Sequence, residues 1–210
     1  DLLGVGPGDE VITPPNSFIA STAVIIHRGA RPVFVDVLPN QNIDPDKIES
    51  AITSKRKAIM PVHLTGRACE MDSIMEIADK HGLSVVEDAA QAIGSKYKGK
   101  PSGSIGHVGC FSTHPLKNLN ACGDGGFMTT NDEKIYLKAR AIRNHGMANR
   151  NNVNQFGYVS RMDNLQAAIL NYRLQRLDVI IDKRRKNAQS YFEARNAAEI
   201  LLPIENNHEF

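Results

Sequence analysis

The chain has 210 residues, of which 41% are hydrophobic and 23% charged, and this composition is typical of a folded protein with a sizeable core. The formal net charge of +2 gives no reason to expect a nucleic-acid partner. Cys69, Cys110 and Cys122 form no CxxC pair, which argues against a disulfide framework or a metal site. The sequence shows neither a membrane-spanning run nor a signal peptide, and we expect a cytoplasmic protein.

Short β-branched runs alternate with helical patterns in the first half of the chain. We expect strands at residues 10–13, 32–37, 58–62 and 83–87. Helices are expected between them, at residues 17–27, 44–52 and 71–81. Asp44 is the expected cap of the second helix, with Pro45 in its first turn, and Gly82 closes the third. Strands that are apolar on both faces and separated by helices predict βαβ units and a mostly parallel sheet flanked by helices.

The second half of the chain has shorter strands and longer helices. We expect strands near residues 93–97, 108–111 and 126–130, followed by helices at 132–144, 161–175 and 176–195. The polar stretch 146–157 between the first two helices is predicted to be a long loop. The basic run 183–186 (KRRK) lies in a helical stretch, where a solvated face is favoured over a binding patch.

The carboxyl ends of the predicted parallel strands are where a ligand is expected to bind. Lys117 follows the apolar run 108–111 in a loop that contains Pro115 and several glycines, where neither helix nor strand is favoured. A lysine at the end of a buried strand is poorly solvated, so its amine can be reactive. The alternative for Lys117 is an ordinary surface lysine.

Asp88 follows another buried strand, at 83–87, and it allows two interpretations. It either caps a helix or balances the charge of a ligand cation such as a protonated ring nitrogen. Together with a reactive Lys117, the second interpretation suggests pyridoxal phosphate, which needs a lysine and an acid beside its ring nitrogen. Ser112 can serve its phosphate, and Phe18 either lies flat against the ring or is a core residue.

Several segments, in order along residues 2–195, resemble the DegT/DnrJ/EryC1/StrS family of pyridoxal-phosphate-dependent sugar aminotransferases. They are "GVGPGDEVITPPNSFIAS", "GARPVFVDV", "IMPVHLTGR", "VVEDAAQAIGSKYKGK", "GCFSTHPLKNLNACGDGGFMTTND", "IRNHG" and "GYVSRMDNLQAAIL". The resemblance implies the type I fold of aspartate aminotransferase. Residues 1–175 would then form most of the cofactor-binding large domain, and 176–210 a long helix and the start of a C-terminal small domain that is largely missing. The chain starts without Met, and we expect it to be a segment of a longer protein.

The resemblance also implies a role for each matching residue. Lys117 would form the Schiff base and shuttle protons, Asp88 would pair with the ring nitrogen, and Gln91 would touch the ring hydroxyl. Ser112 would bind the phosphate and Phe18 would stack on the ring. The glycines at 123–126 would let the chain turn tightly at positive φ.

The implied reaction transfers an amino group from glutamate or glutamine to the keto group of a nucleotide-linked deoxysugar, for polysaccharide or secondary-metabolite synthesis, in a cytoplasmic homodimer. Some family members instead dehydrate deoxysugars with a histidine in place of Lys117. A third hypothesis is a non-catalytic interaction or regulatory module. It draws on Val159, which stands where most members have an asparagine that reaches the partner's phosphate, unless the polar loop before Val159 compensates. His63, His114 and Arg161 are weaker candidates for substrate contacts, with structural roles as the alternatives.

Overall fold

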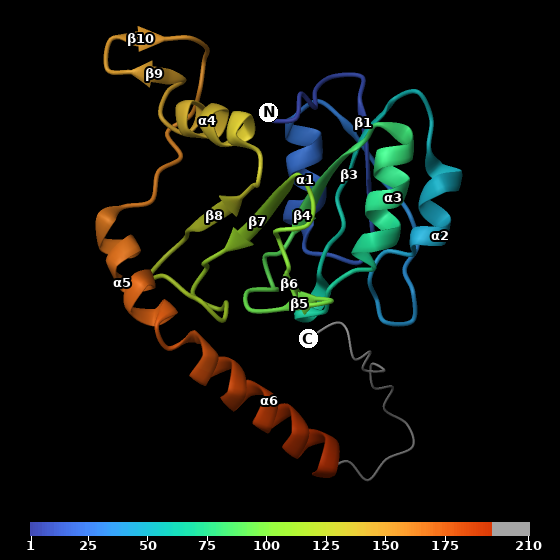
Figure 1. Ribbon diagram of the computed structural model, residues 1–210, viewed down its shortest axis with the longest axis vertical. Coiled ribbons are helices and arrows are strands. Elements are labelled where there is room, and N and C mark those ends of the chain that lie inside the picture. The colour runs from blue at the N-terminus through green and yellow to red at the C-terminus, as the bar shows by residue number, and fades with distance from the viewer. Residues whose placement is uncertain (195–210) are drawn as a thin grey trace.

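The fold is described for residues 1–194 of a computed structural model (Figure 1). A six-stranded sheet has the strand order β2-β1-β3-β4-β7-β8. These strands are β1 (Glu10–Thr13), β2 (Arg31–Phe34), β3 (Arg56–Ile59), β4 (Ser84–Asp88), β7 (Val108–Ser112) and β8 (Gly126–Thr129). Neighbours from β2 to β7 run parallel, and β8 is antiparallel to β7. The predicted α/β fold with a mostly parallel sheet is confirmed.

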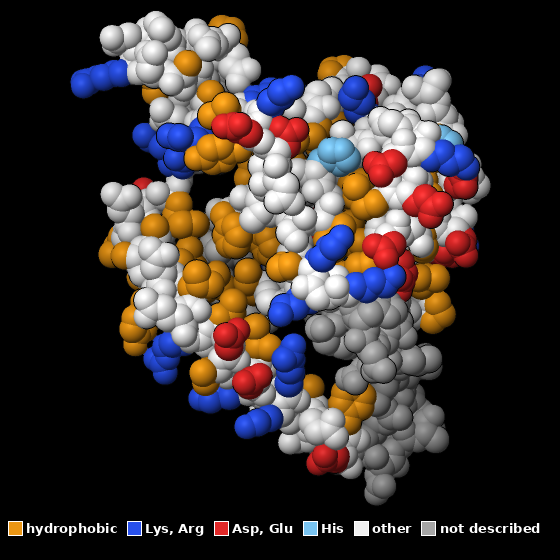
Figure 2. All heavy atoms as spheres, in the orientation of Figure 1, with side chains coloured by type: hydrophobic (Ala, Val, Ile, Leu, Met, Phe, Trp, Pro, Cys, Tyr) orange, Lys and Arg blue, Asp and Glu red, His pale blue; other side chains and the backbone are white. Residues whose placement is uncertain are grey.

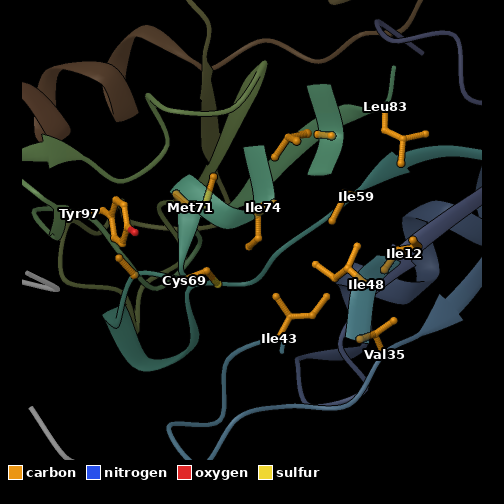
Figure 3. Close-up of a cluster of buried hydrophobic side chains, with 13 residues drawn as sticks. Ile12, Val35, Ile43, Ile48, Ile59, Cys69, Met71, Ile74, Leu83 and Tyr97 are labelled. Atoms are coloured by element: carbon orange, nitrogen blue, oxygen red, sulfur yellow. The ribbon is translucent and has the colours of Figure 1, made fainter. Parts of the chain in front are cut away.

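Helices cover both faces of this sheet. Helix α1 (Ile19–His27) packs on one face, and α2 (Pro45–Ile48) and α3 (Met71–His81) pack on the other. Later in the chain follow α4 (Glu133–Ile142), α5 (Asn164–Leu174) and α6 (Leu177–Ala194), and short 3-10 turns form at η1 (Glu49–Ala51) and η2 (Leu64–Gly66). Ile12 and Val85 point into a core that α2 and α3 close, as Figure 3 shows for Ile12 and its neighbours. Val11 and Val86, one position away on the same strands, lie on the face that packs against α1. The alternation of strand side chains thus explains why these strands are apolar on both faces.

Helix α3 begins and ends where the sequence predicts. Its buried face is formed by Met71, Ile74 and Ala78, spaced three and four residues apart. Gly82 stops the helix at φ 63°, a left-handed conformation that favours glycine. At the shorter α2, the Asp44 side chain accepts a hydrogen bond from the Asp46 amide at 3.1 Å, so the predicted cap is confirmed. The helix predicted over 44–52 changes to the 3-10 turn η1 after Ile48.

Two small hairpins form where the sequence predicts a loop and a single strand. The predicted loop 146–157 contains the antiparallel pair β9 (Met147–Asn149) and β10 (Asn152–Val153). Its turn is closed by Asn149, whose Oδ1 accepts from the amides of Asn151 and Asn152 at 3.0 and 3.1 Å. The strand predicted near 93–97 is shortened to β5 (Lys96–Tyr97) and pairs with β6 (Lys100–Pro101), which the sequence analysis did not predict.

The last two helices join the body through a separate small core. Leu119, Ala121, Leu170 and Leu177 form this cluster. Helix α5 starts at Asn164, later than the predicted 161, because segment 158–160 hydrogen-bonds to the end of α4. Helix α6 is seen to Ala194, and the rest of the predicted unit 176–210 lies outside the described residues. Among the described residues, no helix has the length and apolar character that crossing a membrane requires.

Candidate active site

A cavity of about 650 Å³ lies at the carboxyl ends of β4 and β7, against the start of α1. This is the edge of a parallel sheet at which ligands bind. Six of the predicted site residues line the cavity: Phe18, Asp88, Gln91, Ser112, His114 and Lys117. His63 and Arg161 do not line it.

Asp88 is the last residue of β4, and its carboxylate is fixed on both oxygens. The Ser21 hydroxyl donates to Oδ2 at 2.6 Å, and the Ala90 amide donates to Oδ1 at 3.1 Å. The Ser21 oxygen lies 2.7 Å from that of Ser17, which precedes α1 in the chain. No helix follows Asp88 before β5, so the alternative of a helix-capping aspartate is wrong. The sequence analysis does not name Ser21, although in the helix expected over 17–27 a spacing of four residues would place it on one face with Ser17.

Glu87, the neighbour of Asp88, points to the opposite face of the sheet and is fully buried. Its carboxylate accepts from His63 Nε2 at 2.9 Å and from the amides of Gly103, Ile105 and Gly106 at 2.6, 2.8 and 2.6 Å. Burial opposes ionisation, but the hydrogen bonds from His63 and the amides outweigh it and hold the pKa of Glu87 below its ordinary value. Glu87 therefore anchors the turn at 103–106 to the strand that carries Asp88.

His63 serves this buried arrangement rather than the cavity. Its Nδ1 accepts a hydrogen bond from the Cys69 amide at 3.1 Å, so the proton is on Nε2, which donates to Glu87. The side chain has no exposed surface. The hypothesis that His63 contacts substrate therefore does not fit the structure, and the hydrogen-bonded structural alternative does.

Lys117 lies in a loop that is folded back on itself by backbone hydrogen bonds. Its amide donates to the His114 carbonyl at 2.8 Å, and the Thr113 amide donates to the Gly125 carbonyl at 2.9 Å. Within the described part of the chain, no carboxylate forms an ion pair with the Lys117 amine, which lines the cavity. The amine is therefore available to a ligand.

The glycines after Lys117 are needed for two different reasons. Gly123 has a φ of 149°, whereas Gly125 and Gly126 do not have positive φ. A Cβ on Gly126 would lie 2.6 Å from the Phe111 carbonyl oxygen, across the β7–β8 pair. The expectation of positive φ throughout 123–126 is thus wrong for these two glycines, which allow close approach of the chain instead.

The other cavity residues offer an aromatic ring and hydrogen-bonding groups. Phe18 is 72% exposed, so the alternative of a core phenylalanine is wrong. The side-chain oxygen of Gln91, Oε1, accepts from the Thr65 amide at 2.9 Å, which leaves the side-chain NH₂ group of Gln91 to donate to a ligand. Ser112 Oγ accepts from the His114 amide at 3.3 Å and keeps its own proton for another acceptor.

Arg161 and Val159 lie outside the cavity, on the segment that precedes α5. Arg161 donates to the Asn144 side chain at 3.4 Å and forms no ion pair with another described residue, so the alternative of a helix-start salt bridge is not seen there. A substrate contact of Arg161 stays a prediction. Val159 forms an antiparallel bridge with Asn144 and is 64% exposed.

An amine, a carboxylate, a hydroxyl and an exposed aromatic ring around one cavity form the set of groups that pyridoxal phosphate requires. A model of DegT/DnrJ/EryC1/StrS aminotransferases matches residues 1–209. The chain belongs to this family. Its members use pyridoxal phosphate and act on nucleotide keto-sugars with an amino donor.

Relatives within the family carry both regulatory and enzymatic names. A "Pleiotropic regulatory protein" of Geobacillus stearothermophilus is 50% identical over 90% of this chain and 51% of its own length. A UDP-N-acetyl-3-dehydro-alpha-D-glucosamine 3-aminotransferase of Acidithiobacillus ferrooxidans is 46% identical over 96% of this chain and 55% of its own. The structure of S. venezuelae DesV superposes with a TM-score of 0.94 at 40% identity, covering 99% of this chain and 56% of DesV. The chain thus spans about half the length of these relatives.

Proposed function

We propose that the protein is a pyridoxal-phosphate-dependent aminotransferase that moves an amino group from glutamate or glutamine to a keto group of a nucleotide-linked deoxysugar. The observation that carries the proposal is that Lys117 and Asp88 line one cavity, at the ends of the adjacent strands β7 and β4. Family membership supports the reaction class, and relatives with sugar aminotransferase names support the substrate class.

Each residue has a proposed task in this reaction. When bound, the cofactor supplies an electron sink for the carbon that loses its proton. Asp88, held by Ser21 and the Ala90 amide, keeps a proton on the ring nitrogen. Lys117 would hold the cofactor, and its amine, once released, would move the proton to and from the substrate carbon.

The remaining cavity residues bind and orient the cofactor. Gln91 donates its NH₂ group to the ring hydroxyl, since its carbonyl oxygen is taken by Thr65. Ser112 donates to the phosphate, and Phe18 covers one face of the ring. We further propose, from the family resemblance, that the protein acts as a homodimer.

Adding pyridoxal phosphate to the protein, expressed from its complete gene, tests this proposal. We expect a yellow absorption band that borohydride removes while fixing the cofactor to Lys117, and that glutamate bleaches. Lys117→Ala should lack the fixed cofactor but retain the wild-type unfolding temperature, because the Lys117 amine makes no ion pair with a described carboxylate. A wild-type protein without the band at saturating pyridoxal phosphate would contradict the proposal.

A second candidate function is a non-catalytic regulatory module. It is favoured by one observation, the 50% identity to a protein named as a pleiotropic regulator. A module of this kind has no need of the amine, so it would show neither the band nor bleaching by glutamate. The dehydratase alternative is disfavoured by Lys117, which stands where that branch of the family has a histidine.

A further inference from the structure

The basic run 183–186 on α6 contains two kinds of side chain. All four are exposed, and Figure 2 shows Lys and Arg side chains along this helix. Arg184 and Arg185 also line two neighbouring hollows of about 510 and 150 Å³, whereas Lys183 and Lys186 line neither. The expectation of a purely solvated face therefore fits the two lysines better than the two arginines.

Packing at the start of α6 fixes where these arginines lie. Leu177 is buried in the cluster with Leu119 and Ala121. One turn later, Ile181 packs so closely on Gly94 that a Cβ there would lie 2.3 Å from its Cδ1. Arg184 follows Ile181 by three residues and is thereby held over the turn at 91–95.

The larger hollow opens beside the candidate active site. Ala90, Gln91, Leu116 and Lys117 line both it and the 650 Å³ cavity. Among the residues that the structure describes, the charged ones lining it are Lys117, Arg184 and Arg185, and none of the lining residues is a carboxylate. In the described part of the chain, the sole carboxylate paired with these cations is Asp182, at 3.9 Å from Arg185 on the exposed helix surface. The hollow is therefore a cationic extension of the cavity.

We propose that Arg184 and Arg185 bind the diphosphate of the nucleotide-linked substrate, and this assignment rests on the proposed function. Guanidinium groups bind phosphate oxygens through paired hydrogen bonds, and two of them match the multiple charges of a diphosphate. The hollow adds about 510 Å³ of space on the side of Lys117, which a nucleotide-linked sugar can use and a compact amino acid does not require. The Asn118 side-chain amide can supply a neutral donor along the same wall.

Inorganic pyrophosphate is the probe for this site. Its affinity is measured by calorimetry on the pyridoxal-phosphate-loaded protein, expressed from its complete gene, for the wild type and for Arg184→Ala/Arg185→Ala. We expect the double variant to bind pyrophosphate about tenfold to a hundredfold more weakly. Lys183→Ala/Lys186→Ala removes the same charge from the same helix and should bind as the wild type does. Both double variants should keep the wild-type unfolding temperature, because alanine favours helix and these side chains are exposed.

Three further readouts separate this proposal from its rivals. The absorption band and its bleaching by glutamate should be unchanged in Arg184→Ala/Arg185→Ala. Unchanged pyrophosphate affinity, or an equal loss in the lysine control, would overturn the diphosphate site. A lost glutamate reaction with normal pyrophosphate binding would also overturn it and would assign the arginines to the amino donor. If the wild type shows no band with pyridoxal phosphate, the proposed function fails, and pyrophosphate affinity of the unloaded protein still decides whether the anion site exists.

Discussion

Replacing the buried carboxylate of Glu87 by an amide is expected to destabilise the fold strongly. Glu87 accepts four hydrogen bonds, two on each oxygen: Oε1 from Ile105 and Gly106, and Oε2 from His63 and Gly103. In Glu87→Gln one oxygen can keep its pair of donors, but the NH₂ group then faces the other pair. His63 cannot relieve this by changing tautomer, because its Nδ1 accepts from the Cys69 amide.

The size of the effect follows from the bonds that are lost. A hydrogen bond to a charged group contributes about 1.5–3 kcal/mol, so two of them amount to roughly 3–6 kcal/mol. Burying a neutral amide costs less than burying a carboxylate, which moves the expected loss toward about 3 kcal/mol. This is a large part of the roughly 5–15 kcal/mol by which domains are usually stable.

Urea denaturation of the wild type and Glu87→Gln measures this loss directly. Glu49→Gln is the matched control, since Glu49, like Glu87, pairs with a histidine but lies on the surface, where it also pairs with Lys80. We expect a much smaller change for the control, because solvent screens exposed ion pairs. A loss below about 1 kcal/mol in Glu87→Gln would refute the idea that this carboxylate anchors the 103–106 turn.

Four further predictions follow from particular residues. The pKa of Glu87 in the folded protein lies below its ordinary 4.5, so the stability that the carboxylate contributes is complete above that pH and is lost as the pH falls through the lower folded value. Acid titration should therefore lower the stability of Glu87→Gln less steeply than that of the wild type, and parallel curves would contradict this. Gly82→Ala should lower the free energy of unfolding by about 1–2 kcal/mol, because φ is 63° while the space around it is empty, and an unchanged urea midpoint would count against the left-handed cap. Gly126→Ala should lower the free energy of unfolding by about 1–3 kcal/mol and weaken pyridoxal phosphate binding in a spectral titration, since its Cβ would meet the Phe111 carbonyl. Wild-type stability and wild-type binding would show that β7 and β8 can separate there without cost. Phe18→Ala should change stability by less than about 0.5 kcal/mol but weaken cofactor binding about three- to tenfold, and a loss of stability without a loss of binding would contradict the stacking role.

The sequence predicts best those elements whose side-chain period agrees with their surroundings. Helix α3 is amphipathic, has Gly82 at its end and was predicted to the residue. The sheet was predicted as mostly parallel because its strands are apolar on both faces, and the sequence gives no comparable signal for the 147–153 hairpin. The turn of that hairpin is closed by one side chain, Asn149, which accepts from two amides beyond it, and several asparagines in the stretch have the same propensity.

The sequence likewise predicts part of the candidate site and misses another part. Lys117 and Asp88 were brought together by a topological argument, that residues after adjacent parallel strands share one edge of the sheet, and the cavity contains both. The position of His63 after its strand makes it a weaker candidate for the same edge, and its side chain turns into the core. The Cys69 amide and Glu87 hold the ring in that direction, and Glu87, itself bound to the 103–106 turn, lies 24 residues away in the sequence.

Glu87 and Asp88 show why one strand can carry both a structural and a functional acid. Successive side chains of β4 point to opposite faces, so Val85 and Glu87 face the core closed by α3 while Val86 and Asp88 face α1 and the cavity. On the core face, Glu87 holds β4 through hydrogen bonds from backbone amides, and these bonds do not require a ligand. Asp88, held in front by Ser21, keeps lone pairs for a ligand cation because an amide and a hydroxyl use only part of its acceptor capacity. A change at Glu87 should therefore act on the cavity through stability, whereas a change at Asp88 should act on cofactor chemistry with the fold intact.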